Sequence, residues 1–231
     1  MARAESKMVM GYLPIEPHHH PAILSLVAPA TPTVKLLDPF AGDGLFLDVA
    51  AKAWNVTPYA NELDGERAQA CIERFGPTQA VRCDVERPLA SSNAFCAVWL
   101  NPPYDHDKTA KANKRVEFAY LRHSWKWLQD GGLALWCIYS QHITEDAAAF
   151  LAKNSSRVDV WALPGKHQGE YDQVVVAAIK GTQPNPTALY QVILAGKAEP
   201  LPLTVQPEPL YKLPPPPQIT RFVFAPDIID E

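Results

Sequence analysis

The sequence lacks several features that would place it in a specialised class of protein. Its cysteines are few and scattered, and none of them forms a CxxC pair; the four are Cys71, Cys83, Cys96 and Cys137. This spacing favours buried, reduced thiols over a metal centre or a disulfide framework. No apolar run approaches the roughly 20 residues of a membrane helix, and the N-terminal residues show no signal-peptide pattern. We therefore expect a cytoplasmic protein that does not bind membranes.

An excess of basic charge is also missing. The chain has 21 Lys and Arg residues against 25 Asp and Glu residues, which gives a formal net charge of -4. Binding to nucleic-acid phosphates depends on clustered Lys and Arg side chains that displace counterions, so only a local patch could bind a nucleic acid. Such a patch lies between residues 108 and 126, where one acid, Glu117, accompanies Lys108, Lys111, Lys114, Arg115, Arg122 and Lys126. A solvated basic face is the alternative interpretation.

What the chain does have is an alternation of strand-like and helical patterns. With 231 residues and 47% hydrophobic content, it is long enough for one sizeable α/β domain. The expected strands are 34–38, 56–61, 79–83, 95–100, 133–139, 157–162 and 174–179, and the expected helices are 45–54, 64–75, 116–129 and 144–153. This alternation predicts a doubly wound, mostly parallel, seven-stranded sheet with helices on both faces. The last two strands are expected to form an antiparallel edge pair. Trp125 and Trp127, in the expected helix 116–129, are expected in the core.

The two ends of the chain differ from this central pattern. Near the N-terminus, His18 to His20 precede a short helical pattern at 22–27; adjacent side chains point apart, so we expect a solvated stretch and no metal site. Ten of the 23 prolines lie between Pro184 and Pro217, which favours extended structure. We divide the chain into residues 1–33, 34–182 and a proline-rich C-terminal extension, 183–231. This extension is expected to wrap over the domain or to link outward to a protein partner, with a possible final strand at 221–224.

A glycine-containing motif, DPFAGDG (38–44), lies between the first expected strand and its helix. Glycines let the backbone turn tightly and approach a ligand closely. In an open parallel sheet, ligands bind in the crevice at the carboxyl ends of the strands. The third glycine of a dinucleotide-binding GxGxxG is absent, because Leu47 occupies its position.

Acidic residues follow three successive expected strands: Asp38, then Glu62 and Asp64, then Asp84. A row of acids would repel the pyrophosphate of a dinucleotide. It would suit a ligand with a cationic amino group, a ribose diol and an adenine, and S-adenosylmethionine fits that description. For Glu62 and Asp84 taken alone, solvated turn carboxylates are the alternative.

Together with a second motif, NPPY (101–104), these residues resemble the motif series of class I S-adenosylmethionine-dependent methyltransferases. The likeness is to the amino-methylating group that includes DNA adenine-N(6) methyltransferases, over roughly residues 11–180, and implies a Rossmann-like methyltransferase domain at 34–182. By this resemblance the methionine part lies against Asp38, Pro39, Phe40, Ala41, Gly42 and Gly44, the ribose and adenine against Glu62, Leu63 and Asp84. Residues 1–33, with Tyr12, would form a cofactor-contacting segment.

The second motif suits methylation of a flat amino group. The lone pair of such a nitrogen is delocalised, and acceptors for its two hydrogens would free it for attack on a methyl group. The side-chain oxygen of Asn101 and the backbone carbonyl of Pro102 are such acceptors, while Pro102 and Pro103 offer no competing N–H. Tyr104 would stack on the substrate, worth about 1–3 kcal/mol for a base.

The acceptor itself is less closely defined by these residues. NPPY resembles motifs of enzymes that methylate adenine in DNA, bases in RNA or the glutamine amide of proteins, and the Asp-Pro-Phe form of the first motif resembles the DNA enzymes most. Related enzymes keep an aromatic residue in the loop at 163–172 to hold a flipped base, which suggests Tyr171 first and His167 second. Without a large target-recognition domain, site specificity is expected to be low or supplied by a partner. A non-catalytic module that binds the cofactor or nucleic acid is the alternative from another class.

Overall fold

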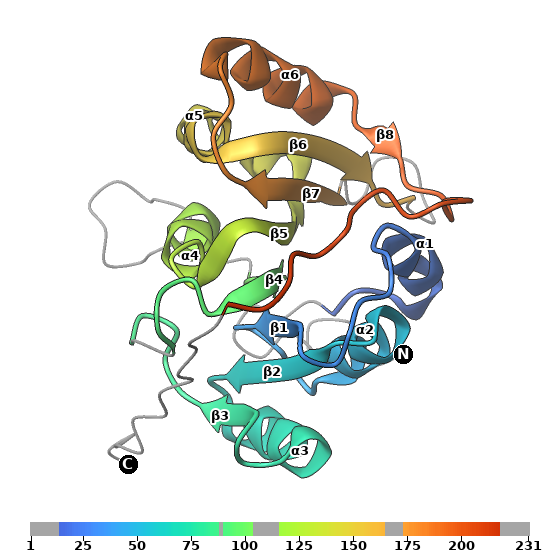
Figure 1. The fold of residues 1–231 in the computed structure, drawn as a ribbon, viewed down its shortest axis with the longest axis vertical. Coiled ribbons are helices and arrows are strands. Elements are labelled where there is room, and N and C mark those ends of the chain that lie inside the picture. The colour runs from blue at the N-terminus through green and yellow to red at the C-terminus, as the bar shows by residue number, and fades with distance from the viewer. Residues whose placement is uncertain (1–13, 88–89, 104–115, 165–172, 218–231) are drawn as a thin grey trace, which may run out of the picture.

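The computed structural model describes residues 14–87, 90–103, 116–164 and 173–217, which form an eight-stranded sheet with helices on both faces (Figure 1). The strands are β1 (Lys35–Asp38), β2 (Thr57–Glu62), β3 (Ala80–Arg82), β4 (Phe95–Leu100), β5 (Leu128–Tyr139), β6 (Ser155–Ala162), β7 (Gln173–Lys180) and β8 (Leu201–Pro202). The helices are η3 (Pro17–His19), α1 (His20–Ser25), α2 (Leu45–Trp54), α3 (Gly65–Phe75), α4 (Val116–Ser124), η4 (Ser140–His142), α5 (Glu145–Asn154) and α6 (Pro186–Ala198). Within these ranges, no helix has the length and apolar character needed to cross a membrane.

The strand order is β3-β2-β1-β4-β5-β7-β6-β8. Strands β1 to β5 pair in parallel, and β7 is antiparallel to both of its neighbours, β5 and β6. The predicted doubly wound class is confirmed, but the strand count is eight, because β8 adds to β6 in parallel. The predicted antiparallel pair therefore forms inside the sheet and not at its edge. From β1 the chain adds β2 and β3 on one side of the sheet, and then continues with β4 on the other side. The carboxyl ends of β1 and β4 are therefore the switch point where such folds bind ligands.

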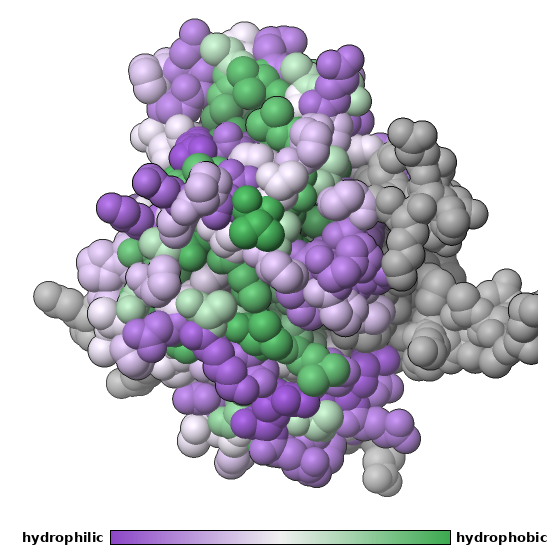
Figure 2. All heavy atoms as spheres, turned by 90° about the vertical axis from the view of Figure 1, so that its right-hand side faces the viewer, coloured by the Kyte–Doolittle hydropathy of each residue, from purple (hydrophilic) through white to green (hydrophobic). Residues whose placement is uncertain are grey.

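Each face of the sheet has its own hydrophobic core. Residues of α1, α2 and α3, with Trp54 and Cys71 among them, pack on one face, and residues of α4, α5 and α6, with Leu121 and Leu151, pack on the other. All six residues of the central strand β4 are buried, as expected for a strand covered on both sides. Figure 2 shows the right-hand side of Figure 1, where hydrophobic side chains lie in separate groups among polar ones.

The region between α4 and β5 differs from the sequence prediction. The helix ends at Ser124 instead of 129, and β5 begins at Leu128 instead of 133. A tight turn replaces the last predicted helical turn, because the Trp127 N–H donates to the Ser124 carbonyl (3.0 Å) and the Trp127 carbonyl accepts from the Phe95 N–H (3.0 Å). Trp125 and Trp127 are buried, so their predicted place in the core is confirmed.

The prediction of extended structure in the proline-rich region is wrong for residues 186–198, which form α6. The Asn185 side chain caps this helix by accepting from the Ala188 N–H (3.1 Å), and Pro186 occupies its first turn. An asparagine cap followed by proline is a known start signal for helices, and the high proline content of the region obscured it. The predicted strand at 221–224 lies outside the described residues.

Residues 203–215, here called the C-terminal strap, wrap over the domain, as one of the two expected arrangements has it. Leu203 and Tyr211 are buried in the core that also contains α1. The Tyr211 N–H donates to the Leu26 carbonyl, and the Tyr211 carbonyl accepts from the Ala28 N–H, each at 2.9 Å. The strap therefore holds the N-terminal helix against the sheet (Figure 1).

Candidate active site

The two motifs lie side by side at the switch point of the sheet. DPFAGDG begins with the last residue of β1, and NPPY follows the last residue of β4. The two strands are hydrogen-bonded neighbours, with Leu37 opposite Val98. The glycines lie in a strand-to-helix turn and the second motif follows a strand, so both predicted placements are confirmed.

The turn of the first motif depends on two glycines in left-handed conformations, Gly42 (φ 58°) and Gly44 (φ 76°). A Cβ atom at Gly44 would lie 2.7 Å from a ring carbon of Phe75 and 3.2 Å from the Cys71 sulfur. Such distances leave no room for a side chain. Gly44 thus lets the turn pack directly on α3, a structural role that the sequence motif did not indicate.

Asp38 ends β1 with its side chain buried, and it accepts a hydrogen bond from the Phe40 N–H (2.9 Å). Burial raises the pKa of this carboxyl from 3.8 to about 8; the Phe40 hydrogen bond opposes the rise, and the nearby Glu62 charge adds to it. At neutral pH the carboxyl therefore holds a proton in most molecules. A cation placed beside it would favour the charged form, so Asp38 is suited to bind a cationic group.

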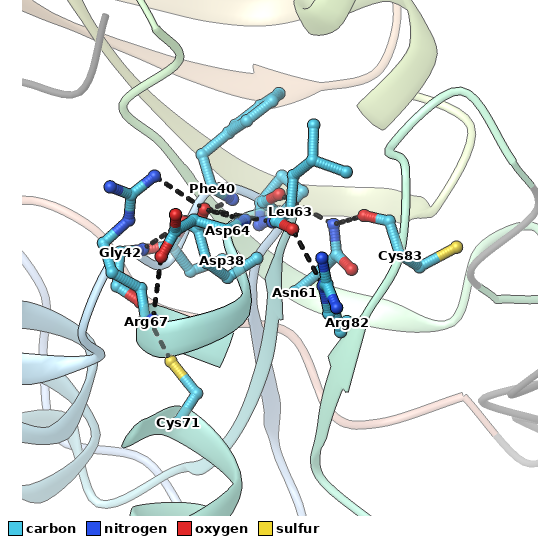
Figure 3. A network of polar contacts seen from close by, with 12 residues as sticks. Asp38, Phe40, Gly42, Asn61, Leu63, Asp64, Arg67, Cys71, Arg82 and Cys83 are labelled. Carbon is cyan, nitrogen blue, oxygen red and sulfur yellow. Dashed lines mark hydrogen bonds and ion pairs between the residues drawn. The ribbon is translucent and has the colours of Figure 1, made fainter. Parts of the chain in front are cut away.

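Glu62 ends β2 and is the centre of a polar network. Figure 3 shows this network, with Gly42, Leu63 and Arg67 among its labelled members. Its carboxylate accepts hydrogen bonds from the turn of the first motif and from the start of α3; the donors are the N–H groups of Gly42, Leu63 and Asp64 and the guanidinium of Arg67. The neighbouring Asn61 donates to the carbonyls of Pro39 (3.1 Å) and Cys83 (3.0 Å). Side chains of β2 thus join the ends of β1, β2 and β3.

The other two acids of the series have local roles in the structure. Asp64 caps α3 by accepting from the Arg67 N–H (3.0 Å). Asp84 follows β3, is exposed, and accepts from the Glu86 N–H (2.9 Å) in a tight turn. Asp64 is therefore a helix cap, whereas Asp84 lies at the carboxyl end of its strand, where the sequence placed it.

These features point to a known family. A family model described as an uncharacterised methyltransferase family, DUF6094, matches residues 1–215. The chain belongs to this DUF6094 family. A search of curated proteins gave no significant match.

Solved structures similar to this DUF6094 chain are methyltransferases of low sequence identity. A type I restriction-modification methyltransferase subunit from Streptococcus thermophilus has a TM-score of 0.56 and 17% identity, over 82% of this chain and 53% of that one. A protein assigned as a class I S-adenosylmethionine-dependent methyltransferase from Listeria monocytogenes has a TM-score of 0.56 and 13% identity, over 80% of this chain and 73% of that one. The M. jannaschii tRNA m1G37 methyltransferase has a TM-score of 0.51 and 16% identity, over 73% of this chain and 52% of that one. The chain thus spans about half of the S. thermophilus subunit and shares the methyltransferase fold.

The residues at the carboxyl ends of β1 and β2 fit S-adenosylmethionine, the predicted cofactor, and the chain belongs to a methyltransferase family. Asp38 is suited to a cationic group, and the Glu62 carboxylate is an acceptor at the next strand end. Leu63 leaves 42% of its surface exposed and so provides an apolar contact for a flat ring. The Phe40 ring lies 4.9 Å from that of Tyr120 on α4, centroid to centroid, and adds an aromatic surface.

On the acceptor side, the structure describes only part of the predicted site. Asn101 and Pro102 are buried and Pro103 is half-buried, directly after β4. The other predicted acceptor-side residues lie outside the described residues; they are Tyr104, Lys108, Lys111, Lys114, Arg115, His167 and Tyr171. Tyr12, predicted to contact the cofactor, also lies outside them.

Sequence reasoning missed three residues that contact the predicted cofactor residues: Arg67 contacts Glu62, Cys71 contacts Gly42 and Tyr120 contacts Phe40. The Cys71 thiol donates to the Gly42 carbonyl (3.2 Å), and burial raises its pKa to about 12. Arg67 and Cys71 are four residues apart on α3 and so share one face of the helix, a spacing that could have shown them together. The histidines expected to be solvated also differ, because His19 is buried and His20 packs on Phe46 at 5.0 Å between ring centroids.

Proposed function

We propose that this protein transfers the methyl group of S-adenosylmethionine to the exocyclic amino nitrogen of adenine in DNA. The observation that carries the proposal is the adjacency of two motifs at the switch point. Asp38 and Glu62 end β1 and β2, and Asn101 follows β4, the strand beside β1. The predicted cofactor residues and the predicted hydrogen-bond acceptors thus lie at the ends of neighbouring strands.

The cofactor residues act by charge and hydrogen bonding. S-adenosylmethionine, when bound, supplies an electrophilic methyl group on a positively charged sulfur. Asp38 binds the cationic amino group of the methionine part, Glu62 accepts from the ribose, and Leu63 lies against the adenine. Asp84 and the turn at Gly42 complete the contacts that the motif resemblance implies.

The acceptor residues prepare the amino nitrogen for attack. The Asn101 side-chain oxygen and the Pro102 carbonyl accept one amino hydrogen each, which frees the nitrogen lone pair as charge develops. Both residues are buried, so these hydrogen bonds form in a medium where they are stronger than in water. Tyr104 stacks on the base and holds it in line with the methyl group.

A polynucleotide acceptor is supported by the basic residues between 108 and 126, which follow the acceptor motif in the sequence and offer charges that bind phosphates. DNA is favoured over RNA because the similar S. thermophilus structure is a restriction-modification methyltransferase subunit. An RNA base is the alternative acceptor, supported by the similarity to the M. jannaschii tRNA methyltransferase. A cytoplasmic location, where either nucleic acid is available, is part of the proposal.

Transfer of a tritiated methyl group to DNA, RNA and protein, offered in parallel, tests the proposal. Counts in DNA that disappear with Asn101→Ala are expected, and counts in RNA alone would overturn the assignment to DNA. Loss of a hydrogen bond that strengthens in the transition state lowers kcat by about 100- to 1,000-fold. Calorimetry of Asn101→Ala should give a nearly unchanged affinity for S-adenosylmethionine, and Asn101→Asp, which keeps an acceptor oxygen, should recover part of the rate.

A further inference from the structure

The two oxygens of the Glu62 carboxylate accept different numbers of hydrogen bonds. Oε2 accepts one hydrogen bond, from the Gly42 N–H at 2.8 Å. Oε1 accepts three, from the Leu63 N–H (3.0 Å), the Asp64 N–H (2.9 Å) and Arg67 Nη2 (3.0 Å). Two atoms of one side chain therefore have very different numbers of donors.

This difference decides which oxygen can bind a further donor. A carboxylate offers about four lone-pair positions, two on each oxygen. Oε1 accepts from three donors, one more than its two positions, whereas Oε2 accepts from one donor and keeps one position. A ribose hydroxyl that approaches Glu62 can therefore be accepted by Oε2 without displacing a protein group.

Arg67 is the donor that sets this orientation. The other groups on Oε1 are backbone N–H groups, which a residue of any type would supply at those positions. Arg67 begins from a fixed point, because its own N–H is held by the Asp64 side chain that caps α3. Its side chain is 18% exposed and that of Glu62 is 7% exposed, so the ion pair is largely shielded from water.

We propose that Arg67 is a positioning residue for the cofactor: it fixes Glu62 with Oε1 filled, and leaves Oε2 to accept one ribose hydroxyl. The inference rests on the proposed function, because it assumes that the ligand at Glu62 is S-adenosylmethionine. Arg67 acts through Glu62 and touches neither the methyl group nor the acceptor. It should therefore set the affinity for the cofactor and leave the chemical step unchanged.

Replacing Arg67 tests this role against a matched control on the same helix. Arg74 also lies on α3 and pairs with a carboxylate, Asp48 (3.7 Å), on the outer surface. Arg67→Met should raise the Kd and the KM for S-adenosylmethionine by about 10- to 100-fold, with kcat within about 2-fold of wild type. Arg67→Lys should restore part of the affinity, and Arg74→Met should leave the Kd unchanged.

A double-mutant cycle separates positioning from general weakening of the fold. In a Glu62→Gln background, Arg67→Met should add little to the loss of affinity, because the group that it positions has already changed. Additive losses, or an Arg67→Met affinity equal to that of Arg74→Met, would overturn the inference. If wild-type protein fails to bind S-adenosylmethionine, the proposed function fails; if it binds and both Arg67 variants bind equally well, only the role of Arg67 fails.

Discussion

At the scale of single residues, the burial of Asp38 suits the site to a cationic ligand but lowers the stability of the fold. Its pKa is raised from 3.8 to about 8, chiefly by burial. Between these values the folded protein keeps a proton that the unfolded chain has lost, so stability falls as pH rises from about 4 to about 8 and levels off above that. The charge that acts on it is that of Glu62 on β2, which is negative and adds to the rise in the pKa.

Asp38→Asn should therefore stabilise the protein while removing cofactor binding. The asparagine oxygen can still accept from the Phe40 N–H, and no buried charge has to form. At pH 8 the free energy of unfolding should rise by about 2–5 kcal/mol, and its fall between pH 5 and pH 8 should largely disappear. Urea unfolding at several pH values measures the free energy of unfolding and its dependence on pH. Asp48→Asn, on the surface of α2, should retain the wild-type slope, and an Asp38→Asn protein with that same slope would contradict the assignment.

Sequence alone could place Asp38, Glu62 and Asn101, because each lies at the end of a segment that the strand-helix alternation predicts as a strand. It could not separate binding acids from structural ones. Asp64 was grouped with the ligand-binding series, yet it caps a helix, and a cap is recognised only when the first residue of the helix is known. The part played by Arg67 depends on the direction of a side chain across two elements, which no sequence pattern specifies.

At the scale of elements, the predicted bounds are correct where a periodic pattern extends over the whole helix or strand. The strand β4 and helix α2 have their predicted bounds, because uninterrupted apolar and amphipathic patterns specify them. The end of α4 was misplaced because the tryptophans after Ser124 continue a helical pattern while hydrogen bonds to β4 favour a turn. Helix α6 was missed because composition was given more weight than the cap at Asn185.

The packing of the first motif on α3 leads to a test of two glycines. Gly44 and Gly131 have nearly the same φ, 76° and 75°, but the nearest atom to an added Cβ is at 2.7 Å in the first and at 4.0 Å in the second. Gly131→Ala should cost about 1–2 kcal/mol for its left-handed backbone alone. Gly44→Ala should cost clearly more in urea unfolding, because the Phe75 ring must also move. Equal losses in the two variants would mean that the contact with α3 is not tight.

At the scale of the whole molecule, the C-terminal strap joins parts of the chain that are far apart in sequence. Tyr211 donates through its hydroxyl to Asp159 Oδ2 (2.6 Å) and accepts from Trp161 Nε1 (3.2 Å), both on β6. Its backbone binds that of Leu26, at the end of α1. Pairings over such separations leave no periodic signal, so the sequence indicated that the tail would wrap over the domain without showing where.

Tyr211→Phe tests how much the strap contributes to stability. The variant leaves the buried Trp161 N–H without its acceptor, while Asp159 keeps its ion pair with Arg157 (2.7 Å). Burial and the bond to Asp159 raise the pKa of the Tyr211 hydroxyl well above its usual range, so the hydroxyl stays protonated and the loss should not depend on pH. The free energy of unfolding should fall by about 1–3 kcal/mol in urea, the cost of one unsatisfied buried group.

Tyr190→Phe, on the half-buried face of α6, serves as the control for Tyr211→Phe and should change stability by less than about 0.5 kcal/mol. Cofactor affinity, measured at a temperature where both variants are folded, should stay at the wild-type value, because β6 is three strands from β4 in the sheet. A Tyr211→Phe protein with full stability and weakened cofactor binding would instead place the strap at the active site. That result would assign the strap to function, whereas the expected one assigns it to holding the end of α1 next to β6.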